Sequence, residues 1–232
     1  MKKNILCIGG SHGIGFETVK ILSKDHNIIV ASRTSEMLQE QQITHHTFDV
    51  MTDNIEDLDL PECLDGLVYF PGSINLKPLK MLKIKDFQYD MELNFFSLVK
   101  VVQALIPKLK RSKNPSLVFF STVAVKIGMP FHTSVAAAKG AIEGFAKALA
   151  AEYAPLFRVN VIAPSLTNTS LAQKILSSED KKSKMDSRHP LKRIGEPEDI
   201  ANLVVFLLSE NSNWMTGQIL SIDGGLSSIN LN

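Results

Sequence analysis

The chain has 232 residues, and domains commonly run from roughly 50 to 250 residues, so one large α/β domain is the simplest expectation. Hydrophobic residues make up 44% and charged residues 21%, which is enough apolar material for a packed core and excludes a disordered chain. Lysine and arginine number 25 against 24 acidic residues, so bulk charge attracts neither nucleic acid nor an anionic membrane, and neither is expected as a partner.

The N-terminal residues and the cysteines bear on the compartment. The basic start at Lys2 and Lys3 is followed by only four apolar residues, Ile5–Ile8, too few for a signal peptide. No apolar run approaches the roughly 20 residues that span a bilayer. Cys7 and Cys63 lack metal-ligand spacing, so they are expected in the core and no metal site is predicted. These features predict a cytoplasmic protein.

Short apolar runs alternate with helical segments along the whole chain. Strands are expected at Asn4–Ile8, Asn27–Ala31, His46–Phe48, Gly66–Phe70, Ser116–Phe120, Arg158–Ile162 and Gln218–Ile222. The clearest helices are expected at Gly13–Ser23, Asp86–Lys110, Ser134–Tyr153 and Pro197–Leu208. This alternation predicts a doubly wound α/β fold, with a seven-stranded, mostly parallel sheet covered by helices on both faces. No repeat or linker divides the chain, so residues 1–232 are expected to form a single domain.

A polar, charged segment, Ser177–Lys184, stands apart from this alternation. One interpretation is a mobile flap over a binding site, since such loops often carry function. The other is a helix whose charged side chains simply face water, which is the usual meaning of a charge run.

The first strand continues directly into a glycine-rich turn with glycines at positions 9, 13 and 15, followed by a helical pattern. Glycines permit a tight turn and a close approach to the backbone, so the helix N-terminus can present its N–H groups to a pyrophosphate. A plain turn is the alternative. The position after the first strand favours phosphate binding.

The spacing Gly9-x-x-x-Gly13-x-Gly15 resembles that of the short-chain dehydrogenase/reductase family, which has a Rossmann-type fold and binds a nicotinamide dinucleotide. The resemblance implies that the turn holds the cofactor and that the single domain carries both cofactor and substrate sites. The turn residues expected to bind the cofactor are Gly9, Ser11, His12, Gly13, Ile14 and Gly15. Ile8 stands where the family usually has threonine.

The second strand ends at Arg33, where a dinucleotide fold places the adenosine ribose. An acid there would bind the 2′-hydroxyl, whereas a guanidinium matches a 2′-phosphate. The sequence therefore favours NADP(H) over NAD(H), with Ser32, Thr34 and His12 assisting. An ordinary surface arginine is the alternative.

Two further cofactor contacts are implied by the resemblance. Asp49 and Val50 match the family's adenine-binding pair. Gly72 closes the fourth strand in place of the family's Asn-Asn-Ala-Gly turn, and the stretch here reads Tyr69-Phe70-Pro71-Gly72. The glycine is kept for close approach to the cofactor, and both asparagines are lost.

The family's active site joins an asparagine, a serine and a Tyr-x-x-x-Lys pair. Asn94 fits the asparagine, Lys139 fits the lysine, and Thr122 keeps a hydroxyl at the serine position. The tyrosine position is Val135, thirteen residues after Thr122 (135 − 122). In the family the phenol gives a proton to the reduced carbonyl, which valine cannot do. The resemblance thus implies a divergent active site.

His132 is a candidate substitute for the missing phenol, because an imidazole titrates near neutral pH. A lone loop histidine is more often simply solvated. General acid catalysis contributes about 10² to 10⁴ in rate, so its loss would leave slow chemistry.

The downstream sequence extends the resemblance to about residues 4–226. Pro164 and Thr167 correspond to residues over the nicotinamide, with Thr169 as an alternative to Thr167 and Ser165 in place of a glycine. Residues 190–200 and 216–225 follow the family's C-terminal pattern, which implies a homo-oligomer, dimer or tetramer. Leu166, Leu171, Ile175 and Met185 suggest an apolar cleft, with core packing the more frequent meaning of such residues.

Three functions compete. The first is an NADP(H)-dependent reductase of a small-molecule carbonyl, such as a 3-oxoacyl thioester, similar to the 3-oxoacyl-carrier-protein reductases but with another proton source. The second is a catalytically impaired dinucleotide-binding or regulatory protein. The third is another reaction on the same scaffold, such as enoyl reduction or dehydration, which no particular residue indicates.

Overall fold

The computed structural model describes residues 2–230, in which strands and helices alternate. The strands are β1 (Asn4–Ile8), β2 (Asn27–Ser32), β3 (Ile43–Thr47), β4 (Gly66–Tyr69), β5 (Ser116–Phe120), β6 (Arg158–Pro164) and β7 (Ile219–Ile222). The α-helices are α1 (Gly13–Leu22), α2 (Ile84–Met91), α3 (Ser97–Leu109), α4 (Val123–Ile127), α5 (Thr133–Tyr153), α6 (Glu179–Arg188) and α7 (Pro197–Leu208). The shorter elements are the 3-10 helices η1 (Glu36–Leu38), η2 (Ile55–Asp57), η3 (Leu79–Met81), η5 (Ser170–Ala172) and η6 (Glu210–Ser212), and the π-helix η4 (Glu92–Phe96).

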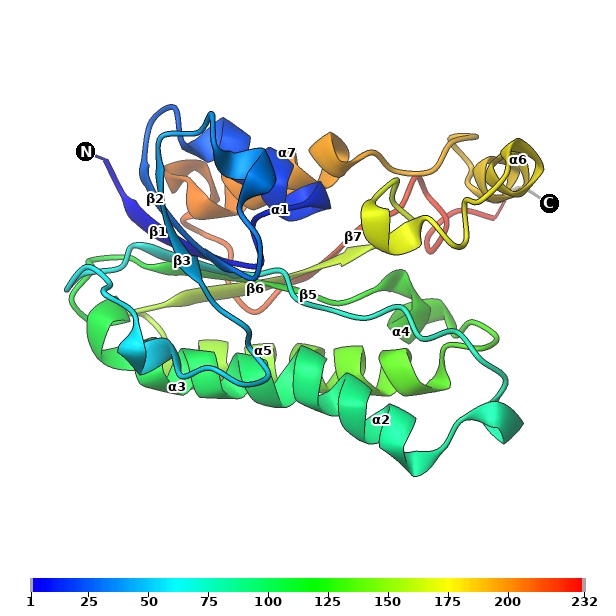
Figure 1. Ribbon diagram of the computed structural model, residues 1–232, viewed down its shortest axis with the longest axis horizontal. Coiled ribbons are helices and arrows are strands. Elements are labelled where there is room, and N and C mark those ends of the chain that lie inside the picture. The colour runs from blue at the N-terminus through cyan, green and yellow to red at the C-terminus, as the bar shows by residue number, and fades with distance from the viewer. Residues whose placement is uncertain (1, 231–232) are drawn as a thin grey trace.

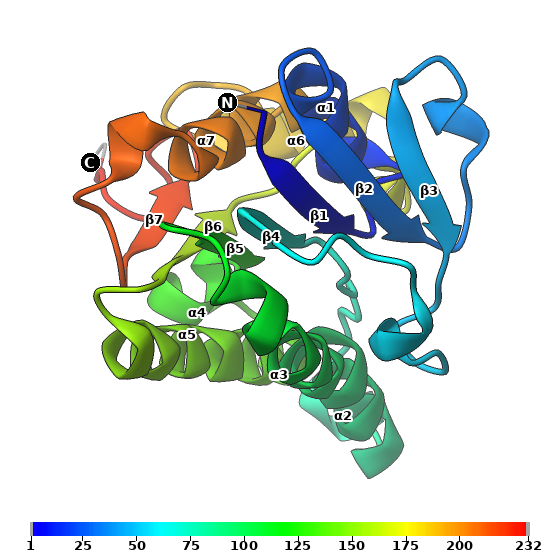
Figure 2. The same cartoon turned by 90° about the vertical axis from the view of Figure 1, so that its left-hand side faces the viewer.

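Within residues 2–230 the seven strands form one parallel sheet in the order β3-β2-β1-β4-β5-β6-β7, which Figure 2 shows as a twisted fan. The predicted sheet is confirmed. The third strand was predicted at His46–Phe48 and lies instead at Ile43–Thr47. As the edge strand, β3 has only partly buried and exposed side chains, so it lacks the continuous apolar run that marks a central strand.

Both faces of the sheet are covered, by α1 and α7 on one side and by α3 and α5 on the other (Figure 1). The alternation of side chains along β1 explains its apolar sequence: Ile5 and Cys7 belong to the core under α1 and α7, and Leu6 and Ile8 to the core under α3 and α5. Cys7 is fully buried as expected, whereas Cys63 is only partly buried.

The helix predicted at Asp86–Lys110 is interrupted, because a π-helix, η4, separates α2 from α3. A π turn displaces the regular backbone hydrogen bonds and frees a carbonyl. The Asn94 side-chain amide nitrogen donates to the backbone carbonyl of Asp90, four residues earlier, at 2.7 Å. This carbonyl thereby gains a hydrogen-bond partner. The bulge therefore fixes the side chain of one predicted site residue.

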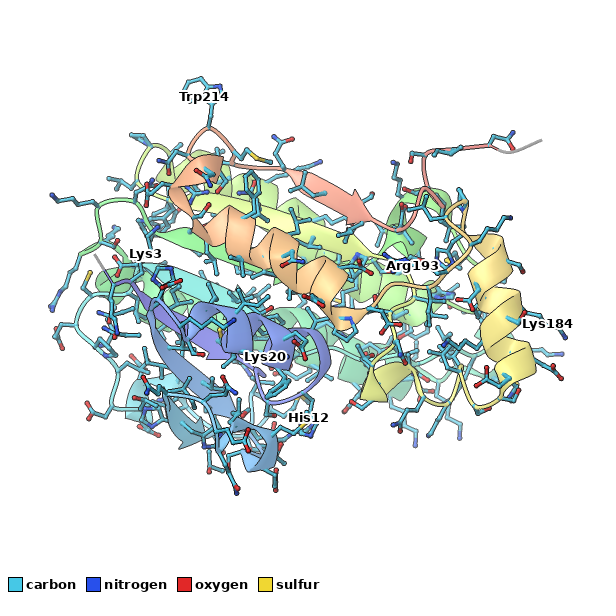
Figure 3. All side chains as sticks on the ribbon, turned by 90° about the horizontal axis from the view of Figure 1, so that it is seen from above. Lys3, His12, Lys20, Lys184, Arg193 and Trp214 are labelled. Carbon is cyan, nitrogen blue, oxygen red and sulfur yellow. The ribbon has the colours of Figure 1, made fainter. Side chains whose placement is uncertain are left out.

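The charged segment forms α6, which contains no buried residue and begins with Ser178 accepting a hydrogen bond from the Lys181 N–H. Figure 3 shows Lys184 on this helix at one end of the molecule, pointing to solvent. The segment is thus a helix with a solvated face, and the flap over a binding site stays a prediction. In the described part of the chain, none of the helices has the length and apolar character needed to cross a bilayer.

Candidate functional site

A cavity of about 1100 Å³ opens at the carboxyl ends of the strands. It lies where the sheet order reverses between β1 and β4, the usual ligand position in doubly wound sheets. The predicted residues that line it are Gly9, Ser11, His12, Gly13, Ile14, Gly15, Ser32, Arg33, Thr34, Asp49, Val50, Gly72, Thr122, His132, Val135, Lys139, Pro164 and Thr167. Asn94 is fully buried just behind this lining. The fold thus brings the predicted site residues to one place.

The glycine turn is shaped by backbone contacts. A Cβ on Gly15 would lie 2.8 Å from the Gly9 carbonyl oxygen, and Gly9 itself has a φ of +79°. The Pro71 ring would be 3.2 Å from a Cβ on Gly9, and the Phe70 ring 3.3 Å from one on Gly15. Packing by Pro71 and Phe70 therefore supports this turn where the sequence lacks the family's asparagines.

The end of the cavity expected to hold the adenosine ribose carries converging polar groups. The Ser11 hydroxyl lies 3.0 Å from His12 Nδ1 and 3.1 Å from the Thr34 hydroxyl, and His12 points outward at the turn in Figure 3. The Ser32 hydroxyl donates to the Thr34 carbonyl at 2.8 Å. Arg33 is exposed, and residues 2–230 offer it no hydrogen bond or ion pair. Its guanidinium is thus available to an anionic ligand.

The reacting corner combines Thr122, Val135 and Lys139. Thr122 caps α4 by accepting the Ala124 N–H at 3.3 Å, so its own hydroxyl hydrogen stays free to donate into the cavity. Val135 and Lys139 lie one turn apart on α5, and both are more than nine-tenths buried. Burial lowers the pKa of Lys139 to about 8, while the charge of Asp90 acts in the opposite direction. This corner offers the hydroxyl of Thr122 and the ammonium of Lys139, and Val135 adds an apolar side chain beside them.

Gly72 brings two polar atoms together at this corner. A Cβ on Gly72 would lie 3.1 Å from Lys139 Nζ and 3.2 Å from Asn94 Oδ1, and this Oδ1 is buried without a hydrogen-bond partner. The Lys139 ammonium likewise has no hydrogen bond or ion pair in the described part of the chain. The Lys139 ammonium, a donor, and Asn94 Oδ1, an acceptor, therefore lie near each other beside the cavity without hydrogen-bond partners.

Sequence reasoning missed a buried polar network behind this corner. Asp90 is fully buried and accepts the Ser73 hydroxyl at 2.7 Å and the Ser134 hydroxyl at 2.5 Å. Ser73 in turn accepts the Asn94 amide at 3.0 Å. A signal was present, because an acid four residues before Asn94 lies on the same face of a helix.

Two further groups that sequence reasoning missed, Tyr89 and His189, line the cavity. Tyr89 comes from α2 and keeps 54% of its surface exposed. His189 is buried, and its Nε2 lies 2.8 Å from the Ser165 hydroxyl. Its Nδ1 lies 2.8 Å from the Met185 carbonyl, which can only accept, so this nitrogen carries the proton. His132 Nδ1 is bonded in the same way to the Pro130 carbonyl at 2.7 Å.

The apolar residues beyond Pro164 line the cavity rather than the core, against the more frequent meaning of such residues. They are Leu166, Leu171, Ile175 and Met185, none of which is fully buried. They lie in the segment after β6 and on α6, so they form an apolar extension beyond the glycine turn and the reacting corner.

A dinucleotide fits the residues present. The glycine positions of the turn are too close to neighbouring atoms for a side chain, and this close backbone suits a pyrophosphate at the N-terminus of α1. At the other end, the unpartnered Lys139 ammonium and Asn94 oxygen suit a hydroxyl, which accepts from one and donates to the other.

The seven-stranded parallel sheet with its glycine turn at the reversal point defines a Rossmann-like α/β protein. A family model described as Enoyl-(Acyl carrier protein) reductase matches residues 39–227. A tropinone reductase homolog of Arabidopsis thaliana is 32% identical over 97% of this chain and 92% of its own length. The 3-oxoacyl-[acyl-carrier-protein] reductase FabG of Thermotoga maritima is 29% identical, with 97% of each chain covered. The chain belongs to the short-chain dehydrogenase/reductase family of oxidoreductases.

Solved structures share the fold along the whole chain. A short chain dehydrogenase family protein from Francisella tularensis superposes with a TM-score of 0.91 at 28% identity, covering 99% of this chain and 100% of that one. ElxO, solved with NADP bound, superposes with a TM-score of 0.87 at 26% identity, with 99% and 100% covered. The predicted family and fold class are thereby confirmed.

Proposed function

We propose that the protein is an NADP(H)-dependent reductase of a small-molecule carbonyl that works with a proton source other than a phenol at position 135. The observation that carries this proposal is the open cavity, which continues from the glycine turn past Lys139 to an apolar extension. A protein kept only for binding a dinucleotide has no need of that extension. Membership in an oxidoreductase family supports the same conclusion.

Each part of the cavity has a task in this reaction. The glycine turn and the N-terminus of α1 bind the pyrophosphate, and Asp49 and Val50 border the adenine. A bound nicotinamide supplies hydride to the carbonyl carbon. The Thr122 hydroxyl hydrogen, free because its oxygen caps α4, donates to the carbonyl oxygen and orients it.

The preference for NADP(H) rests on Arg33. Its guanidinium is exposed, unpartnered in residues 2–230 and next to the Ser11, His12 and Thr34 group. A 2′-phosphate would give it a charge-assisted, bidentate contact that a 2′-hydroxyl cannot. ElxO, which has the same fold, was solved with NADP.

The apolar extension suits the acyl chain of a 3-oxoacyl thioester, and the relatives named as 3-oxoacyl-[acyl-carrier-protein] reductases support that substrate class. Because other relatives are named as tropinone reductase homologs, tropinone is the second substrate to compare.

The test is a fluorescence titration of the protein with NADPH and NADH, followed by NADPH oxidation with a 3-oxoacyl thioester and with tropinone. Tighter binding of NADPH, with slow turnover of one substrate, is expected. Binding without turnover of any carbonyl would favour the second candidate, a dinucleotide-binding or regulatory protein, which Val135 supports because valine has no proton to give. Failure to bind either dinucleotide would contradict both.

The family resemblance also supports self-association. Ile84 on α2 and Phe96 on η4 expose apolar surface that a second subunit would cover. Light scattering on purified protein measures whether a dimer or tetramer forms. The cytoplasmic location and the single-domain organisation stay predictions, to be tested by cell fractionation and by the cooperativity of unfolding.

A further inference from the structure

The buried carboxyl group of Asp90 has no part in the function proposed above, and serine hydroxyls bond both of its oxygens. Ser73 accepts the Asn94 amide hydrogen at 3.0 Å, so its own hydroxyl proton goes to Asp90 Oδ1 at 2.7 Å. Ser134 donates to Asp90 Oδ2 at 2.5 Å. Both oxygens of this carboxyl group therefore have a serine hydroxyl as partner. The protein holds a fully buried carboxyl group at this position.

The same network fixes the orientation of Asn94. Its amide nitrogen donates one hydrogen to Ser73 and the other to the Asp90 backbone carbonyl at 2.7 Å. Because a carbonyl only accepts, the amide cannot be reversed, and Oδ1 must face Gly72 and Lys139. Asp90 thus positions the acceptor that lies beside the Lys139 ammonium.

Lys139 is the cation on which the charge of Asp90 acts. Its side chain is buried, and the charge of Asp90 raises its pKa against the larger effect of burial, leaving it at about 8. Both Asp90 oxygens are occupied by serine hydroxyls, so its charge acts on Lys139 across space and leaves the ammonium hydrogens free. An unpartnered, buried ammonium at the cavity wall can donate its hydrogens to a bound ligand.

Other ionisable groups near this corner are already engaged. On the helices packed against α5, Asp86 pairs with Lys77 at 3.5 Å and Glu92 with Lys100 at 2.7 Å. On α5 itself, Glu143 accepts the Ser121 hydroxyl at 2.5 Å. Asp90 is left as the carboxylate whose charge acts on Lys139.

On the basis of the proposed function, we infer that the Lys139 ammonium gives the carbonyl oxygen its proton in place of the missing phenol, with Asp90 as the positioning residue that keeps it charged. As hydride adds to the carbonyl carbon, the C=O π bond breaks and its electron pair moves to oxygen. An Nζ–H bond of Lys139 then breaks and an O–H bond forms, leaving a neutral amine. The amine regains its proton from water in the cavity.

The first test follows the titration of Lys139 itself, without cofactor or substrate. Protein carrying ¹³C-labelled lysine is titrated by NMR, and the Lys139 signal is assigned by its loss in Lys139→Arg. A midpoint near 8 is expected for the natural protein, and one lower by about a pH unit or more for Asp90→Asn, because an opposite charge is lost. Glu92→Gln is the matched control, since it removes a carboxylate of the same helical run that pairs with Lys100.

The second test measures reduction. Lys139→Arg keeps the cation but not a releasable proton, so turnover should fall by about 100-fold or more. Asp90→Asn should lose more activity above the natural midpoint than below it, which a merely structural defect would not produce. His132→Gln and Tyr89→Phe should each lose less than Lys139→Arg.

The outcomes separate this inference from the proposed function. NADPH binding without turnover by the natural protein would overturn the carbonyl reduction and the donor role with it. Turnover that survives Lys139→Arg but not His132→Gln or Tyr89→Phe would overturn the inference alone. An unchanged Lys139 titration midpoint in Asp90→Asn would also overturn the inference. So would a Lys139 midpoint in the natural protein at the ordinary lysine value of about 10.5, a result that depends on no variant being folded.

Discussion

The two ends of the cavity offer different kinds of group to a ligand. The glycine turn acts through its backbone, where a Cβ on Gly15 would lie 2.8 Å from a carbonyl oxygen. The reacting corner acts through side chains, with Lys139, Asn94 and Asp90 held by hydrogen bonds and charge. A backbone site fails when atoms are added, whereas a side-chain site can change its chemistry while the fold remains. The sequence predicts such a change at Val135, which is buried on α5 at the cavity wall.

The largest effect is expected when Val135→Tyr restores a phenol one turn before Lys139. Turnover should rise by about 10² to 10⁴, the usual contribution of a positioned general acid. The measurement is kcat for NADPH oxidation with the better of the two carbonyl substrates. Val135→Phe is the control, since it adds the ring without the hydroxyl. An equal gain from both variants would mean that packing, not proton transfer, limits the natural protein.

Gly15→Ala should disable the backbone end. The added Cβ would meet the Gly9 oxygen at 2.8 Å and the Gly10 Cα at 2.9 Å, so the turn must shift. A strain of about 1–3 kcal/mol is typical of such overpacking. NADPH affinity should fall by roughly 10- to 100-fold, the equivalent of that strain, in a fluorescence titration.

Gly144→Ala is the matched control, because Gly144 lies in α5 and a Cβ there meets nothing within 4 Å. Alanine in a helix interior should raise the free energy of unfolding by about 1 kcal/mol and leave NADPH binding unchanged. If Gly15→Ala bound NADPH normally, the pyrophosphate would have to be bound by other residues.

Arg33→Gln should weaken NADPH binding by about 10-fold or more, because a charge-assisted hydrogen bond contributes about 1.5–3 kcal/mol, and should leave NADH binding unchanged. Lys20→Gln is the control, because this lysine pairs with Glu17 at 3.1 Å. Figure 3 shows Lys20 on α1. Equal losses for NADPH and NADH would mean that Arg33 does not read the 2′-phosphate.

The smallest effect is a pH dependence. Burial lowers the pKa of Lys139 from 10.5 to about 8, so its ammonium is the main form below about 8 and is lost as the pH rises through that value. Since the ammonium is the acid, kcat/KM should be level below about 8 and fall by up to about tenfold per pH unit above it. A pH profile that Lys139→Arg leaves unchanged would instead point to another donor.

The sequence by itself determined much of the fold and of the cofactor half of the site. Six of the predicted strands and the helix at Pro197–Leu208 lie within about two residues of their predicted ends, because buried strands and capped helices leave local signals. The glycine turn, Arg33 and the Val135–Lys139 spacing were equally local, each contained in one stretch of chain. Only β3 was displaced, since an edge strand shows half of the apolar pattern.

The tertiary structure decided which side chains meet. Ser134 lies 44 residues from Asp90, and Ser73 lies 17 residues before it, yet both hydroxyls donate to its carboxylate. His189 and Ser165 likewise meet across 24 residues. Hydrogen bonds and charges act over a few ångströms of space, so no spacing along the chain records them. The sequence predicted that a phenol is missing at position 135, and only the packing of α2 against α5 placed a buried carboxyl group near Lys139.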